Sequence, residues 1–93
     1  MKIPKRFELH GKSYTVRIVP GAQWKEDDCL AFFRANTAEI EIKQQSAQMM
    51  EHSFWHELVH AVLDSMNEER LYRNEKFVDV MAALLMQAMK SAQ

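Results

Sequence analysis

The hydrophobic period of the chain changes near residue 43, and this change restricts the possible folds more than any other feature of the sequence. Residues 38–43 read AEIEIK, so apolar and charged side chains alternate. A period of two is typical of a strand with one buried face. After residue 43, apolar side chains recur at steps of three and four residues, as in an amphipathic helix. They are Trp55, Leu58, Val59, Val62, Leu63 and Met66. We therefore expect the strands first and the helices last.

Four stretches of the N-terminal half are predicted strands. Residues 7–10 and 13–19 lie on either side of Gly11 and form a predicted β-hairpin. Residues 29–34 are mostly apolar, and the turn residues Asn36 and Thr37 separate them from the alternating stretch 38–42. These stretches predict a small antiparallel sheet of three to four strands.

Two helices are predicted in the C-terminal half. Ser46 is a suitable N-cap for the first, and Asn67 is a stop signal. The second is expected to run from about Glu68 to Lys90. Its expected buried stripe consists of Phe77, Val78, Met81, Leu84, Leu85 and Ala88. Strands followed by helices indicate an α+β fold with the helices packed on one face of the sheet. The length of 93 residues predicts a single domain, residues 1–93.

Charge and composition exclude several classes of function. The formal net charge is −1, which does not favour binding to nucleic acid or to an anionic membrane. No stretch approaches the ~20 apolar residues of a membrane span, and the N-terminus lacks the apolar run of a signal peptide. Cys29 is the only cysteine, so no internal disulfide can form. We expect a cytoplasmic protein. The sequence does not indicate its oligomeric state.

The first predicted helix contains the motif HExxH, formed by His56, Glu57 and His60. Residues four apart share a helix face, so both imidazoles can bind one metal ion. Glu57 is rotated by about 100° around the helix and need not be a ligand. It can instead accept a proton from a water molecule that the metal activates. The pattern therefore predicts a zinc site with Glu57 as the catalytic base.

Two alternatives to this interpretation concern the histidines. One is a helix that carries surface histidines by chance, but the motif is rare by chance and the helix is expected to be partly buried. The other is His52 as a rival ligand, since it lies one further turn back on the same helix. It is rotated by a further ~40° from the line through His56 and His60, so a solvated surface histidine is the default interpretation.

A catalytic zinc ion usually has three protein ligands, so a third must come from outside the motif. The acidic residues downstream are Asp64, Glu68, Glu69, Glu75 and Asp79. If the helices reverse near Asn67, His60 lies about 10 Å before the turn and Glu75 about 12 Å after it, so the two are nearly level. Asp79 is similarly level with His56. Glu68 and Glu69 lie too near the turn, and Asp64 is on the first helix itself.

The two segments together resemble a known family. HELVH at 56–60, followed by NEKFVD at 74–79, is similar to the HExxH…NExxxD pattern of thermolysin-type gluzincins. The resemblance implies that Glu75 is the third zinc ligand and that Asp79 supports the first histidine. The alternative is that residues 74–79 are only the charged, solvated start of a helix. The short chain and its preceding strands are similar to small phage-type minimal zincins of the ImmA/IrrE class. The resemblance is close over residues 54–79 and loose elsewhere. A linker of 14 residues between His60 and Glu75 is shorter than in thermolysin.

Hydrolysis of an amide also needs a hydrogen-bond donor for the developing oxyanion. Tyr72 lies three residues before Glu75, on the same helix face, and is the preferred candidate; Tyr14 is a weaker one. Packing in the core is the alternative role for either tyrosine. The strand 38–42 directly precedes the metal helix and is expected to hold an extended substrate, unless it is an interior strand without a free edge.

The sequence thus predicts a zinc metallopeptidase that hydrolyses a peptide or protein substrate. Two alternatives remain. A zinc-binding regulatory or protein-interaction module would keep the metal but show little turnover, and a short chain without a second lobe favours it. A hydrolase of non-peptide amides would use the same residues on another substrate. An intact Glu57 favours catalysis, because a structural zinc site has four ligands and needs no base.

Overall fold

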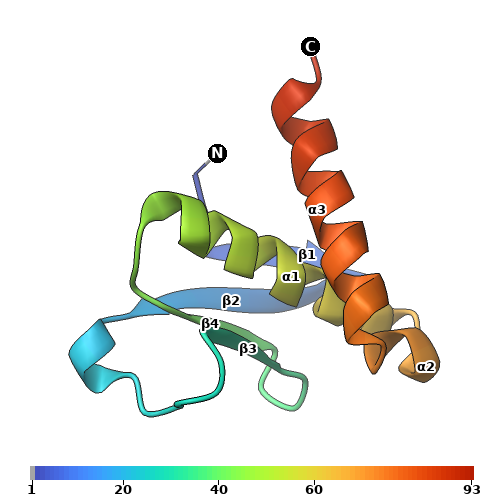
Figure 1. The fold of residues 1–93 in the computed structure, drawn as a ribbon. Coiled ribbons are helices and arrows are strands. Elements are labelled where there is room, and N and C mark those ends of the chain that lie inside the picture. Colours follow the sequence, from blue (N-terminus) through green and yellow to red (C-terminus); the bar gives the residue numbers. More distant parts are fainter. Residues whose placement is uncertain (1) are drawn as a thin grey trace.

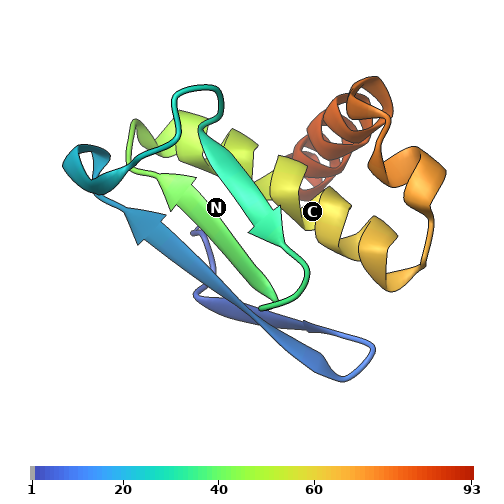
Figure 2. The ribbon, with the colours of Figure 1, turned by 90° about the horizontal axis from the view of Figure 1, so that it is seen from below.

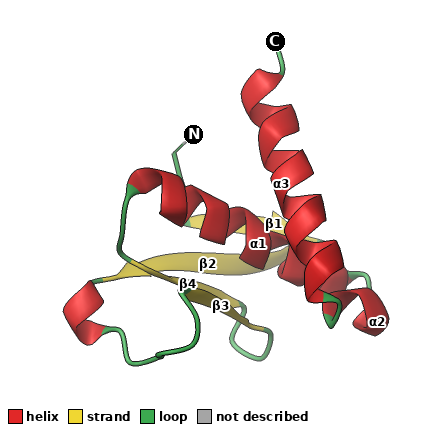
Figure 3. Ribbon diagram, viewed as in Figure 1, coloured by secondary structure: helices red, strands yellow, loops and turns green. Residues whose placement is uncertain are grey.

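The computed structural model describes residues 2–93 and shows an α+β fold with a four-stranded sheet followed by three α-helices (Figure 1). The strands are β1 (Arg6–Leu9), β2 (Lys12–Val19), β3 (Ala31–Arg34) and β4 (Glu39–Lys43), and the 3₁₀ helix η1 (Gly21–Gln23) follows β2. The helices are α1 (Ala47–Ser65), α2 (Glu69–Tyr72) and α3 (Glu75–Ser91). Figure 3 shows α1 lying across the sheet and α3 rising away from it. The predicted fold class is confirmed.

The strand order in the sheet is β1-β2-β4-β3 (Figure 2). The predicted hairpin is present, with φ angles of 51° at His10 and 77° at Gly11, as a type I′ turn requires. The expectation of a purely antiparallel sheet is wrong for one pair, because β2 and β4 are parallel, with Val16 opposite Ile40. The strand β3 pairs with β4 alone and forms one edge of the sheet.

This strand order follows from the lengths of the connections. A tight turn with a φ of 54° at Ala38 joins β3 to β4, so these strands form an antiparallel hairpin. Residues 20–30 form a longer connection, which lets the hairpin dock with β4 inside and β3 outside. The interior position suits β4, since Ile40 and Ile42 have no exposed surface. Burial of these two side chains explains why the alternating strand lies in the middle of the sheet.

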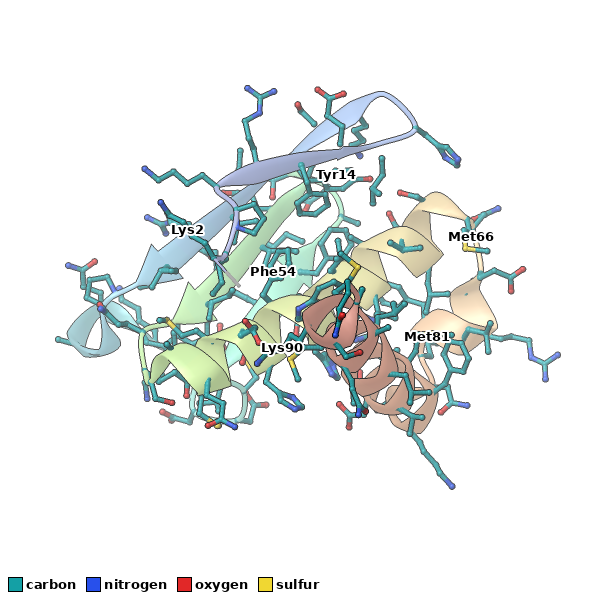
Figure 4. All side chains as sticks on the ribbon, turned by 90° about the horizontal axis from the view of Figure 1, so that it is seen from above. Lys2, Tyr14, Phe54, Met66, Met81 and Lys90 are labelled. Carbon is teal, nitrogen blue, oxygen red and sulfur yellow. The ribbon has the colours of Figure 1, made fainter. Side chains whose placement is uncertain are left out.

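The core lies between α1 and the sheet. Phe54 of α1 packs edge-on against Phe7, with 6.3 Å between the ring centroids. Tyr14 points from β2 toward the C-terminal end of α1, where its hydroxyl lies 3.1 Å from Oγ of Ser65 (Figure 4). Both Tyr14 and Phe54 are only 2% exposed. These contacts fix the rotation of α1 about its own axis.

Both predicted boundaries of the first helix are confirmed. The hydroxyl of Ser46 accepts a hydrogen bond from the Met49 amide at 3.2 Å, as an N-cap does. At the other end, Asn67 has a φ of 59° and its amide donates to Asp64 at 3.0 Å. The Glu68 amide donates to Leu63 at 2.9 Å. These two bonds form a Schellman motif, which ends the helix and satisfies its last carbonyl groups.

The predicted second helix is two helices, α2 and α3. The backbone of Asn74 is extended, with φ −90° and ψ 92°, and its side chain accepts a hydrogen bond from the Phe77 amide at 3.0 Å. An asparagine side chain that bonds to the backbone in this way starts a new helix. The sequence predicts no break here, because residues 68–73 contain neither glycine nor proline.

The expected buried stripe of α3 is correct as far as Met81 and wrong beyond it. In α3, Val78 and Ala82 are buried, whereas Leu84, Leu85 and Ala88 are exposed. The helix crosses α1 steeply instead of running back along it (Figures 1 and 4), so its contact face is short. Lys90 on the last turn forms an ion pair with Glu51 of α1 at 2.9 Å. In residues 2–93, no helix is long and apolar enough to cross a membrane.

Candidate metal centre

Helix α1 carries His56, Glu57 and His60 on the side that faces the start of α3. Trp55, Val59 and Leu63 of the same helix are buried in the core. Because that apolar face is held against the sheet, the face with the histidines must turn outward, toward the side where α3 begins. His60 keeps 9% of its side-chain surface exposed and His56 keeps 22%. Protein atoms alone thus cover most of the surface of both rings.

The first turn of α3 brings two carboxylates to these rings. Oε2 of Glu75 lies 3.0 Å from Nε2 of His56, and Oε1 lies 3.2 Å from Nε2 of His60. Oδ1 of Asp79 lies 2.7 Å from Nδ1 of His56. The predicted positions along the two helices are therefore confirmed: Glu75 lies level with His60 and contacts it, and Asp79 lies level with His56 and contacts it. The capping bond of Asn74 sets the position at which α3, and with it Glu75, begins.

The three residues His56, His60 and Glu75 could hold a metal ion. Each offers one ligand atom, and these atoms lie within 4.8 Å of one another. For bonds of about 2.0–2.1 Å in a tetrahedral site, neighbouring ligand atoms are about 3.3 Å apart. The separations of the two histidine nitrogens from the Glu75 carboxylate, 3.0 Å to Oε2 and 3.2 Å to Oε1, are close to this value. Two imidazoles and one carboxylate therefore fit a single divalent ion.

The ring of His56 faces a carboxylate on each side. A neutral imidazole has only one N–H group, so it can donate to Asp79 or to Glu75 but not to both. A second proton, or a cation between Nε2 and Glu75, must satisfy the other contact. With a cation there, Nδ1 keeps its proton and donates it to Asp79, the arrangement common around metal-bound histidines.

His60 has no such partner. Its Nδ1 is buried and makes no hydrogen bond with any residue of the described chain. Burial lowers the pKa of His60, although the nearby Glu75 carboxylate opposes this effect. Burial thus favours the neutral ring, and a neutral imidazole is the form that binds metal.

Glu57 lies beside the three potential ligands but is not one of them. It is 7% exposed, and burial raises its pKa to about 7; His56 opposes this effect, and the Glu75 carboxylate adds to it. A carboxylate with a pKa near neutral is suited to accept a proton and release it again. Glu57 is thus a buried carboxylate with a raised pKa on the wall of a cleft, and its role as a base stays a prediction.

The two tyrosines have different surroundings, and Tyr72 does not share a helix with Glu75 as expected, because it ends α2. The ring of Tyr72 packs beside the ring of His60, with 4.6 Å between centroids, and its hydroxyl makes no hydrogen bond within residues 2–93. Burial and the carboxylates of Asp64, Glu57 and Glu75 raise the pKa of Tyr72, so the hydroxyl keeps its proton. The weaker candidate, Tyr14, is wrong: its hydroxyl is paired with Ser65 in the core, away from the histidines.

The remaining candidate ligands lie outside the cluster. His52 is exposed and lies on the wall of the cleft described below, but it does not belong to the group that could hold a metal. Asp64, Glu68 and Glu69 instead surround a second, smaller hollow at the far end of α1. These three acidic residues, which helix geometry excluded as ligands, thus lie away from the cluster.

A cleft of about 840 Å³ opens beside the cluster, between α1, β3 and the start of α3. One wall carries His52, His56 and Glu57; the other includes residues 28–33. The strand β4 was expected to hold a substrate unless it was interior, and the structure shows the second case, because β4 is paired on both sides. The wall is β3, whose outer edge has no partner strand in the described chain. Strand order depends on long-range pairing, so no local signal marked β3 as the edge.

Comparisons of this chain with models of known protein families, with curated proteins and with solved structures find no match.

Proposed function

We propose that the protein is a zinc-dependent peptidase of the minimal zincin type. One observation carries the proposal: two histidine nitrogens and a carboxylate converge within 4.8 Å at the wall of an open cleft, with a buried, non-ligating glutamate next to them. A structural metal site needs a fourth protein ligand and no base. Within residues 2–93, the cluster offers three ligands, and Glu57 supplies a base.

The donor set favours zinc. Imidazole nitrogen suits borderline-soft ions such as zinc, whereas magnesium and calcium prefer oxygen ligands alone. Three protein ligands of the His, His, Glu type, with a fourth position left open, are typical of catalytic zinc. The cleft leaves room beside the three ligands for water and substrate.

When bound, zinc would lower the pKa of a coordinated water to about 7 and polarise the carbonyl under attack. The carboxylate of Glu57 would accept the proton of the attacking water and pass it to the nitrogen of the leaving amine. The hydroxyl of Tyr72 would donate a hydrogen bond to the oxygen of the attacked carbonyl as negative charge develops there. Asp79 would hold the ring of His56 in place through Nδ1.

The edge strand β3 supports a peptide as the substrate. Its unpaired backbone groups can form hydrogen bonds with an extended chain, which is the β-augmentation mode of peptide recognition. A peptide aligned with β3 would lie in the same cleft as Glu57 and both histidines. Peptide bonds would then pass directly in front of the residues that are proposed to cleave them.

The direct test is unbiased. Zinc-loaded protein is added to a cytoplasmic extract, and new peptide termini are compared with those produced by the Glu57→Gln variant. A peptidase yields termini that the variant does not. Equal termini in both samples, with zinc bound in both, would favour a zinc-binding regulatory or interaction module instead.

A further inference from the structure

The cleft continues beyond the metal cluster, where two exposed apolar side chains line it. Leu30 lies on the side of β3 and is 41% exposed, and Met49 lies on α1 and is 46% exposed. The other large apolar side chains that are exposed in residues 2–93 do not line this cleft. The most exposed large apolar side chains of the cleft thus lie on its two walls, one on each.

Hydrogen bonds and ring contacts give the order of residues along the cleft. The carbonyl of Leu30 accepts a hydrogen bond from the Lys43 amide at 2.9 Å, which places Leu30 next to the start of α1. At the opposite end of β3, the ring of Phe33 contacts Tyr72, at 6.5 Å between centroids, and Tyr72 contacts His60. The strand β3 therefore runs from the apolar end of the cleft toward the metal cluster.

The distance between the two ends matches a short piece of extended peptide. Met49 precedes His56 by seven residues on the same helix, or about 10 Å along its axis. An extended chain advances about 3.3 Å per residue. A peptide that pairs with β3 would therefore place a side chain at the apolar end about three residues from the bond in front of the metal cluster.

The charge of the cleft narrows the choice of peptide. The charged side chains on its walls, apart from the histidines, are the carboxylates of Asp28, Glu57, Glu75 and Asp79. None of the described residues that line it is lysine or arginine. Away from the proposed ion, an acidic side chain in the bound peptide would thus meet the like charge of Asp28 and find no lysine or arginine on the described walls.

From these observations we infer that the Leu30–Met49 end of the cleft is a specificity subsite for a large apolar side chain, about three residues from the scissile bond of an extended, non-acidic peptide. The inference rests on the proposed function and adds the substrate class to it. Leucine, methionine or phenylalanine would bury apolar surface against both walls there. Such burial raises affinity by about tenfold over a small polar side chain.

The test measures binding, so it does not depend on turnover. The zinc-loaded Glu57→Gln variant is titrated against three fluorescein-labelled decapeptides of alanine and serine, which carry two leucines, two glutamates or neither. We expect the leucine peptide to bind about tenfold more tightly than the neutral one, and the glutamate peptide to bind more weakly than either.

Substitutions then locate the effect. Met49→Gln and Leu30→Gln, each in the Glu57→Gln background, should remove most of the leucine advantage. Met66→Gln is the matched control, because Met66 is 57% exposed at the end of the same helix but does not line the cleft. Equal or absent binding of the leucine peptide, or an equal loss in the Met66→Gln control, would overturn the subsite. If the unmodified, zinc-loaded protein cleaves none of the peptides while the Glu57→Gln variant keeps the binding preference, the peptidase is overturned and the subsite is not.

Discussion

Nδ1 of His56 lies 2.7 Å from Oδ1 of Asp79, a residue that follows it by 23 positions and belongs to a different helix. The opposite nitrogen of the same ring faces Glu75. Asp79 can thus orient the ring without touching an ion bound at Nε2. The Glu75 carboxylate, by contrast, lies 3.0 and 3.2 Å from the Nε2 atoms of His56 and His60, the nitrogens that would bind the ion. The two carboxylates lie four residues apart, and their different distances from the proposed ion predict different effects on its binding.

Removal of Glu75 should weaken zinc binding more than removal of Asp79. Asp79→Ala should cost about 10–100-fold in zinc affinity, as expected for a carboxylate that orients a metal-bound histidine. Glu75→Ala removes one of three protein ligands and should cost more. Zinc affinity is measured by competition with a fluorescent chelator. Glu68→Ala, which removes an exposed carboxylate outside the cluster, is the control and should have no effect. A larger loss in Asp79→Ala would make Asp79 the ligand.

The protein should bind one zinc ion per chain and become more stable when it does. At a free zinc concentration of 100 times Kd, binding to the folded state alone adds about 2.7 kcal/mol, or about 10–20 °C in Tm for a domain of this size. Elemental analysis and thermal unfolding measure the two effects. His60→Ala should lose both, whereas His52→Ala, one turn before His56 on the same helix, should keep both. Equal losses in the two variants would make His52 a ligand.

Glu57 should separate binding from chemistry. Because Glu57 is not in the group of potential ligands, Glu57→Gln should retain zinc with unchanged affinity. Loss of the base should lower kcat by about 10²–10⁴-fold. Zinc content and turnover of the same preparation are compared with those of the unmodified protein. Unchanged turnover would remove Glu57 from the mechanism, and loss of zinc would make it a ligand.

Tyr72→Phe should lower kcat by about 10²–10³-fold and leave zinc affinity unchanged, since it removes only a hydrogen-bond donor. Tyr14→Phe is the matched control. It removes the hydroxyl paired with Ser65, so it should lower the free energy of unfolding by about 1 kcal/mol without changing turnover. Kinetics and denaturant unfolding of both variants test the pair. If Tyr72→Phe is as active as the unmodified protein, the oxyanion donor is another group.

Peptide binding should protect β3 and spare β4. Only β3 has a free edge at the cleft, so its outward-facing amides should exchange more slowly in the presence of a non-cleavable peptide. Hydrogen exchange of zinc-loaded protein, resolved to individual amides, measures this change. The amides of β1, at the opposite edge of the sheet, serve as the internal control. Protection of β1 instead of β3 would contradict the proposed alignment.

Local spacing in the sequence was sufficient for the elements and for much of the cluster. The change of period at residue 43 predicted strands before helices, and Ser46 and Asn67 marked the ends of α1 correctly. The spacing of His56 and His60 placed both rings on one side of a helix. These features depend on neighbours within a few residues along the chain, and backbone geometry alone relates such residues to one another.

Only the tertiary structure decided the strand order, the break at Asn74 and the wall of the cleft. The parallel pairing of β4 with β2 buries Ile40 and Ile42, and it leaves β3 at the edge beside the histidines. Helix α3 crosses α1 steeply, which leaves Leu84 and Leu85 exposed. Each of these outcomes depends on surface buried between segments distant in sequence. Such burial depends on which arrangement of the whole chain has the lowest free energy, and a local sequence pattern does not determine that arrangement.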